Sequence, residues 1–395
     1  MIFREIFAAL AWLIAAIWIV RVLPALFLLP RVPDLLRDQP APDVSATELP
    51  SLAVIVPAKD EVRAVGRSVA AILASDYPAL QTIVVDDRST DGTGELLNAI
   101  AAEPMAAGRL TVLHVRELPE GWIGKPHAMA QAAAMSASEW ILFTDADVCF
   151  APDTLRRAVR FAEQATGDHL VVYPTLELHG WAEKMLGAFF QCASVLGGQP
   201  WKIPDPSARR AYIGVGAFNL IRRSTYEALG GFSALRMEVL EDMRLGFLVK
   251  RNGFAQRVAF GRDLVRIRWA DSAAGMLRNL TKNLFAVFRF RPLNLVLASL
   301  ALLLLCIVPF VAFVMPGVTR WAGILPLLFL LLINIYYRRY TGTSPLYFFL
   351  LPVASVLLAG TMLTSAFVAI RRGGVLWRGT LYPLDELRRR AGALW

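Results

Sequence analysis

Cysteine is scarce in this chain of 395 residues, and its pattern excludes two kinds of site. The three cysteines are Cys149, Cys192 and Cys306, and no two of them form a CxxC pair. A zinc site needs closely spaced ligands, and a disulfide framework needs cysteines in conserved pairs. We therefore expect neither, and interpret all three as small buried hydrophobic residues.

Charge is also scarce, whereas hydrophobic residues are abundant. Charged residues make up 18% of the chain and hydrophobic residues 56%, which is too apolar for an ordinary soluble protein. The formal net charge is +9, and many arginines border long apolar runs instead of forming one basic face. This pattern argues against nucleic-acid binding and favours contact with an anionic membrane surface.

Long apolar runs lie at both ends of the chain. Residues 6–29 lack the small-residue cleavage site of a signal peptide, so we predict a transmembrane anchor over 1–30. A proline-rich linker is expected over 31–50 and a basic tail over 371–395. The C-terminal transmembrane region, 293–370, contains three further apolar runs, at 293–315, 321–337 and 346–370.

The three C-terminal runs raise a question of topology. Three full crossings would put the central domain and the basic tail on opposite sides, whereas the positive-inside rule places both in the cytoplasm. The run 321–337 has 17 residues, at the lower limit for crossing, so we expect it to be re-entrant or interfacial. We predict a multi-pass protein of the cell inner (plasma) membrane with its central domain in the cytoplasm.

The central region, 51–270, alternates short β-type runs with helical patterns. This rhythm predicts an α/β domain with a mostly parallel sheet and helices on both faces. The segment 271–292 is amphipathic, and is either an interfacial helix or an ordinary surface helix. Strands are predicted at 52–56, 81–85, 110–114, 140–144 and 170–173, and helices at 62–74, 92–102, 126–137 and 153–164.

Acidic side chains directly follow three of the predicted strands. They are Asp60 with Glu61, Asp87, and the pair Asp145 and Asp147. Strand carboxyl ends line the ligand crevice of an open α/β sheet, and carboxylates there suit Mg²⁺ or Mn²⁺ with a phosphate-bearing ligand. For the pair at 145 and 147, the alternative is a solvated turn.

Other polar residues could also belong to such a site, but each has a simpler interpretation. Lys125, between Gly124 and a predicted helix, either neutralises phosphate or is an exposed lysine. Glu241 and Asp242 either return to the crevice with a general base or form a charge pair at a helix start. Asp91 is a candidate for capping the helix that follows it.

Taken together and in order, these motifs resemble the family-2 glycosyltransferases over roughly residues 50–270. The arrangement of anchor, central domain and C-terminal membrane segments is similar to the branch of ceramide glucosyltransferase and the bacterial hopanoid-associated and carotenoid glycosyltransferases. The motifs are Val54 to Glu61, Val85-Asp86-Asp87-x-Ser-x-Asp-Gly-Thr, Gly124-Lys125-x-x-Ala128, Asp145-Ala146-Asp147, Gly216-Ala217-Phe218, Leu229-Gly230-Gly231-Phe232, Glu241-Asp242 and the tail motif Trp377-Arg378-Gly379-Thr380-x-Tyr382.

The resemblance implies a GT-A fold, a nucleotide-sugar donor, expected to be a UDP-sugar, and an inverting single displacement that uses Mg²⁺ or Mn²⁺. Asp145 and Asp147 would serve the metal and the diphosphate, and Asp242 would be the catalytic base with Glu241 beside it. The implied donor-binding residues are Pro57, Ala58, Asp60, Glu61, Asp87, Lys125, Asp145, Arg268 and Trp269.

One departure from the family pattern bears on the acceptor. Relatives often carry a (Gln/Arg)-x-x-Arg-Trp motif, but Val265 precedes Arg268 and Trp269 at its first position. Processive synthases use that motif to handle their chain, so we expect transfer of one sugar to a hydroxyl of a membrane lipid such as a hopanoid, carotenoid or glycolipid. A polyprenyl-phosphate sugar synthase and a processive polysaccharide synthase remain alternatives. A transporter is disfavoured, because the polar motifs lie outside the apolar runs.

Overall fold

The computed structural model describes residues 2–38 and 49–390, and these fall into two compact units. We call them the sheet unit and the helical unit. The sheet unit comprises Val32–Glu177, Lys202–Trp269 and Leu376–Trp395, and the helical unit comprises Met1–Arg31, Leu178–Trp201 and Ala270–Val375.

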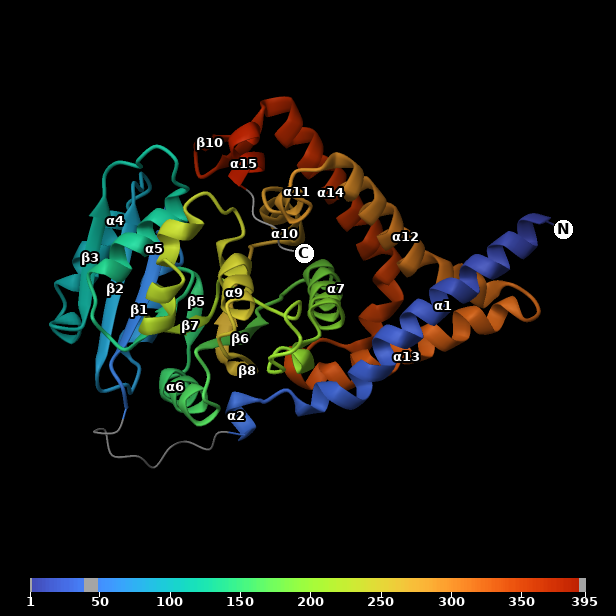
Figure 1. The fold of residues 1–395 in the computed structure, drawn as a ribbon, viewed down its shortest axis with the longest axis horizontal. Coiled ribbons are helices and arrows are strands. Elements are labelled where there is room, and N and C mark those ends of the chain that lie inside the picture. The colour runs from blue at the N-terminus through green and yellow to red at the C-terminus, as the bar shows by residue number, and fades with distance from the viewer. Residues whose placement is uncertain (1, 39–48, 391–395) are drawn as a thin grey trace. The chain divides into compact units, whose positions relative to one another are not determined.

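An eight-stranded sheet in the order β3-β2-β1-β4-β7-β6-β8-β5 forms the centre of the sheet unit (Figure 1). β1 is parallel to β2 and β4, β2 to β3, and β6 to β8, whereas β7 and β5 pair antiparallel to their neighbours. The strands are β1 (Leu52–Ala58), β2 (Leu80–Asp87), β3 (Leu110–Val115), β4 (Trp140–Phe143), β5 (Val148–Phe150), β6 (His169–Leu176), β7 (Asn219–Arg222) and β8 (Gln256–Ile267).

The predicted, mostly parallel sheet is therefore confirmed, but three of its strands were not predicted. β5 and β7 have only three and four residues. β8 is a continuous strand, but it carries Gly261, Arg262 and Asp263 in its middle, where its register with β6 shifts, so its sequence shows no clear alternation. The antiparallel strands are recognisable only through the partners that the fold gives them.

Helices cover both faces of the sheet. Successive side chains of a strand point to opposite faces, and the central strands are apolar on both, so both faces must be buried. Val54 and Val56 join one buried core, whereas Ile55 joins the other. The first core includes side chains of α3 (Val65–Leu73), α4 (Thr93–Ala101) and α6 (Thr154–Gln164), and the second includes side chains of α5 (Gly124–Ala134), α8 (Arg223–Ala228) and α9 (Glu241–Arg251).

The predicted linker and tail are partly folded. Residues 39–48 of the linker and 391–395 of the tail lie outside the described residues. Before them, Asp34 forms a bridge with Phe260, and Leu35 in the short helix α2 (Leu35–Asp38) is fully buried, so a linker does not begin at residue 31. The tail forms a hairpin of β9 (Gly374–Trp377) and β10 (Thr380–Pro383), followed by α15 (Leu384–Arg390).

The helical unit contains, among the described residues, four segments long and apolar enough to cross a membrane. They are Ile2–Arg31, Pro292–Val314, Thr319–Thr341 and Pro345–Arg372. Small side chains of α1, Ala11 and Ala15, belong to one buried hydrophobic cluster with Ala312 of the second segment. The helices of the unit are α1 (Ile2–Leu28), α7 (Trp181–Gly198), α10 (Ala273–Thr281), α11 (Leu284–Val287), α12 (Pro292–Val314), α13 (Thr319–Thr341) and α14 (Leu351–Arg372).

The structure gives the bounds of two segments whose relation to the membrane stays a prediction. The predicted short run 321–337 lies within α13, which has 23 residues, so length does not single it out as re-entrant. The amphipathic segment 271–292 forms two helices, α10 and α11. Short 3₁₀ turns complete the chain at Leu29–Arg31, Pro104–Ala106, Pro200–Lys202, Gly231–Leu235 and Pro345–Leu350.

Candidate active site

The carboxyl ends of β1, β2 and β4 lie at one edge of the sheet. Parallel pairing places Ala58 opposite Asp86, and Ile55 opposite Phe143. Asp145 follows Phe143 by two residues and therefore reaches the same edge as the residues after β1 and β2. The sheet thus brings together the acidic groups that the sequence placed at strand ends.

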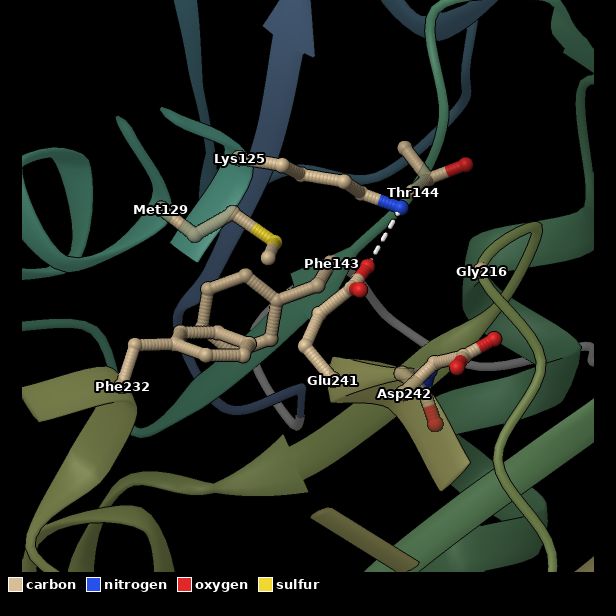
Figure 2. A pocket seen from close by; sticks show the side chains of 9 residues that line it. Lys125, Met129, Phe143, Thr144, Gly216, Phe232, Glu241 and Asp242 are labelled. Atoms are coloured by element: carbon tan, nitrogen blue, oxygen red, sulfur yellow. Dashed lines mark ion pairs between the residues drawn. The ribbon is translucent and has the colours of Figure 1, made fainter. Parts of the chain in front are cut away.

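Lys125 joins this strand edge to helix α9. Its Nζ lies 2.6 Å from Oδ1 of Asp145 and 2.7 Å from Oε1 of Glu241. Figure 2 shows the ion pair with Glu241 as a dashed line. Burial acts to lower the pKa of the Lys125 ammonium, but the charges of Asp145, Glu241 and Asp242 raise it well above its ordinary value. Lys125 is therefore a charged bridge between two segments far apart in sequence, and not a free surface lysine.

Glu241 and Asp242 are the first two residues of α9, yet their side chains point in different directions. The Glu241 carboxylate turns toward Lys125, whereas Asp242 projects toward the loop that contains Gly216 (Figure 2). Burial, followed by the charge of Glu241, raises the pKa of Asp242 to about 7, against the opposing effect of Lys125. A carboxylate with a pKa near neutrality is in the range suited to a general base.

Two glycines allow the loop before β7 to approach Asp242 and Asp145 closely, one at a backbone carbonyl group and one at a carboxylate. A Cβ on Gly214 would overlap the carbonyl oxygen of Asp242, and a Cβ on Gly216 would overlap Oδ2 of Asp145. Both positions therefore depend on the missing side chain of glycine. The sequence pointed to Gly216 as part of a motif, but there was no signal for Gly214, because the close neighbour comes from another part of the chain.

Asp145 and Asp147 are the candidates for holding a divalent cation. Burial, and then the charges of Asp145 and Glu61, raise the pKa of Asp147, so this corner has an excess of negative charge. No group of three or more histidine, cysteine or acidic residues arranged for a metal occurs in the described part of the chain. Two carboxylates nevertheless fit Mg²⁺ or Mn²⁺, which take their other ligands from phosphate and water at nucleotide sites.

The residues predicted to face a nucleotide lie at the ends of β1 and β2, where several already have partners. Both carboxylate oxygens of Asp87 accept hydrogen bonds from Arg88, at 2.8 and 2.9 Å. Asp60 accepts from a backbone N–H of the loop after β2 at 2.8 Å. Asp91 accepts from the backbone N–H of Thr93 at 3.0 Å, but the N-cap residue of α4 is Gly92, so Asp91 shapes the turn before the helix and is not its cap.

Arg268 and Trp269 follow the last residue of β8. The antiparallel register pairs Ile267 with Val148, which sets Arg268 beside Asp147 along the ladder. The guanidinium of Arg268 donates to the carbonyl oxygen of Glu177 at 2.6 Å. The backbone of Arg268 and Trp269 therefore lies beside that of Asp145 and Asp147. The hydrogen bond to Glu177, however, points the Arg268 side chain at a carbonyl group.

Two residues of the tail also reach the site, and the sequence did not place them there. Arg378 forms an ion pair with Glu61, and the hydroxyl of Tyr382 accepts a hydrogen bond from the backbone N–H of Gly124 at 3.2 Å. Both belong to a recognisable tail motif, but only the folded chain brings the tail to the strand ends.

The chain has detectable relatives. Residues 53–243 match the family model described as glycosyl transferase family 2. Relatives include the 4,4'-diaponeurosporenoate glycosyltransferases of Staphylococcus aureus strains bovine RF122 / ET3-1 and USA300, each 27% identical over 199 residues. That match covers 50% of this chain and 50% of each relative, so the chain spans about half the length of the curated relatives it matches.

Solved structures with a partly similar arrangement also exist. A mannosyltransferase from Pyrobaculum calidifontis, in complex with GDP-Man and Mn²⁺, is 19% identical, with a TM-score of 0.48, and the alignment covers 91% of this chain and 98% of that one. Residues 1–349 of S. aureus TarS are 14% identical, with a TM-score of 0.38, over 82% of this chain and 92% of that one.

A mostly parallel sheet with helices on both faces, whose strand ends gather carboxylates around one lysine, defines an α/β enzyme domain of the GT-A type, as expected. Residues 53–243 are a glycosyltransferase family 2 domain.

Proposed function

We propose that this protein transfers a single sugar from a nucleotide-sugar, expected to be a UDP-sugar, to a hydroxyl group of a membrane lipid. The observation that carries the proposal is the bridge made by Lys125, which is 2.6 Å from Asp145 and 2.7 Å from Glu241. This bridge sets the strand end suited to a diphosphate beside the helix start that carries Asp242, the candidate base.

Asp242 acts as the base in this scheme. Its carboxylate takes the proton of the acceptor hydroxyl as the oxygen attacks the anomeric carbon, and the nucleoside diphosphate leaves from the opposite side with inversion. With a pKa of about 7, Asp242 is substantially ionised at neutral pH and is a stronger base than an ordinary aspartate. Glu241 holds Lys125 in place and so preserves the charge balance around the base.

The donor lies along the edge formed by the ends of β1, β2 and β4. Pro57, Ala58, Asp60, Glu61 and Asp87 form the nucleotide side of this edge. Asp145 and Asp147 would hold Mg²⁺ or Mn²⁺, which when bound supplies positive charge to the departing diphosphate. Lys125 contributes a further fixed positive charge beside Asp145, and Arg268 and Trp269 lie next to Asp147.

The acceptor class is inferred from the helical unit and from the relatives. The four candidate membrane spans found among the described residues suit a lipid acceptor, and Arg371 and Arg372 at the end of α14, just before the basic tail, suit the cytoplasmic face of the inner (plasma) membrane. A hopanoid, a carotenoid or a glycolipid would provide the hydroxyl. The relatives' name, which specifies diaponeurosporenoate, favours a carotenoid and adds an acidic acceptor as a second candidate.

The test uses membranes containing the full chain, Mg²⁺ or Mn²⁺, and radiolabelled UDP- and GDP-sugars, with wild type compared with Asp242→Asn. We expect a labelled lipid that the wild type forms and the variant does not. A lipid still labelled by the variant would instead indicate an acidic acceptor, a carboxylate or a polyprenyl phosphate, which needs no base. Label in an insoluble polymer would indicate a processive synthase.

A further inference from the structure

The hairpin at residues 374–383, which we call the C-terminal hairpin, follows the last candidate membrane span. Its strands are joined by Arg378 and Gly379, with φ values of 49° and 80°. Positive φ at both central residues is the geometry of a tight hairpin turn whose twist matches the strands. Local backbone conformation therefore places Arg378 at the tip, where its side chain extends beyond the hairpin.

The tip reaches the end of β1. The guanidinium of Arg378 forms an ion pair with the Glu61 carboxylate, and its Nη1 donates to the carbonyl oxygen of Asp60 at 3.4 Å. The Glu61 side chain is 24% exposed, and its negative charge helps to raise the pKa of Asp147. Arg378 therefore neutralises one member of the acidic group that a negatively charged donor would meet.

The second strand of the hairpin reaches the start of α5. Tyr382 is 6% exposed, and its hydroxyl accepts a hydrogen bond from the backbone N–H of Gly124, the first residue of α5. The first N–H groups of a helix have no partner within the helix, so this contact caps α5. The residue after Gly124 is Lys125. The charge of Arg88 lowers the pKa of the Tyr382 hydroxyl and that of Asp87 raises it, so Tyr382 also lies near the end of β2.

We propose that the C-terminal hairpin is part of the donor site, with Arg378 reducing its negative charge and Tyr382 acting as a positioning residue for Lys125. A nucleoside diphosphate is an anion, and it must bind at an edge that already contains Asp60, Glu61, Asp87, Asp145 and Asp147. Positive charge supplied from the tail lowers that repulsion. The inference rests on the proposed function, because it assigns these residues to the same nucleotide-sugar.

The experiment measures binding of UDP and GDP to the purified full chain in detergent with Mg²⁺, by calorimetry. Arg378→Ala should weaken binding about tenfold, and Arg378→Lys should restore much of it because the charge is kept. Tyr382→Phe, which removes only the hydroxyl, should weaken binding about fivefold. Arg389→Ala is the matched control, since this exposed arginine lies in α15 of the same tail.

Thermal unfolding of each variant separates a binding role from a structural one. A merely structural role would lower the unfolding temperature of Arg378→Ala and Arg378→Lys alike, and would overturn the inference. It would also be overturned if wild type binds a nucleotide and Arg378→Ala and Tyr382→Phe bind it as tightly as Arg389→Ala. If wild type binds neither UDP nor GDP, the proposed function itself fails, and this inference fails with it.

Discussion

Replacing Lys125 by methionine tests whether the charged bridge organises the site. The substitution keeps the length of the side chain but removes the ammonium that contacts Asp145 and Glu241. Glu241 has a side chain only 5% exposed, so its carboxylate cannot regain full hydration. The variant therefore leaves Asp145, Glu241 and Asp242 close together without the cation that now separates their charges.

The size of the effect follows from burial. Breaking a fully buried ion pair destabilises a protein by roughly 3–5 kcal/mol. The side chains of Lys125 and Asp145 are 22% and 33% exposed. We therefore expect a smaller loss, about 2–3 kcal/mol in the free energy of unfolding. Because the charge of Lys125 lowers the pKa of Asp242, its removal should raise that pKa above its present value of about 7.

The assay combines thermal unfolding in detergent with the pH dependence of sugar transfer. Asp242 acts as a base only when ionised, so activity should rise with pH through its pKa, and in Lys125→Met the midpoint should move to higher pH. Lys250→Met is the control. Lys250 is also buried, but its Nζ donates to the carbonyl oxygens of Ile203 at 2.8 Å and Asp205 at 2.7 Å and not to the carboxylates that Lys125 contacts.

The control variant should lose stability and keep the wild-type pH midpoint. An unchanged midpoint in Lys125→Met, together with wild-type stability, would refute the bridge as the organiser of the site. A change of the same size in both lysine variants would show that the shift reflects general destabilisation and not the local charge of Lys125.

Three further predictions concern stability, packing and topology. Burial lowers the pKa of His169 to about 4. The neutral imidazole therefore contributes fully to the free energy of unfolding above the ordinary pKa of histidine, and this contribution should fall by about 3 kcal/mol as the pH drops from about 6.5 to 4. His169→Gln should flatten this pH dependence in unfolding titrations. Gly214→Ala should separate the loop from the carbonyl group of Asp242, lowering both the unfolding temperature and transfer, whereas Gly180→Ala, where nothing lies within 4 Å of the added Cβ, should match wild type in both. Because residues 376–390 belong to the sheet unit, α12, α13 and α14 should together cross the membrane an even number of times, and a reporter fused after Trp395 that maps to the periplasm would contradict this.

Local sequence determined the parts of the fold that depend on periodicity and composition. The runs that became β1, β2 and β4 are apolar and short, and acidic residues follow each of them, so both the strands and the edge where their ends meet could be predicted. The candidate membrane segments were visible for the same reason, since length and hydropathy are properties of one continuous stretch.

Tertiary structure alone decided which of these groups meet. The partners of Lys125 lie 20 and 116 residues further along the chain, and Gly214 is required by a carbonyl group on another element. Arg378 and Tyr382 come to the strand ends although α12, α13 and α14 separate them from the domain in sequence. Contacts of this kind depend on the three-dimensional path of the backbone. Side-chain periodicity shows only whether a face is buried, and it contains no information about which residue lies against that face.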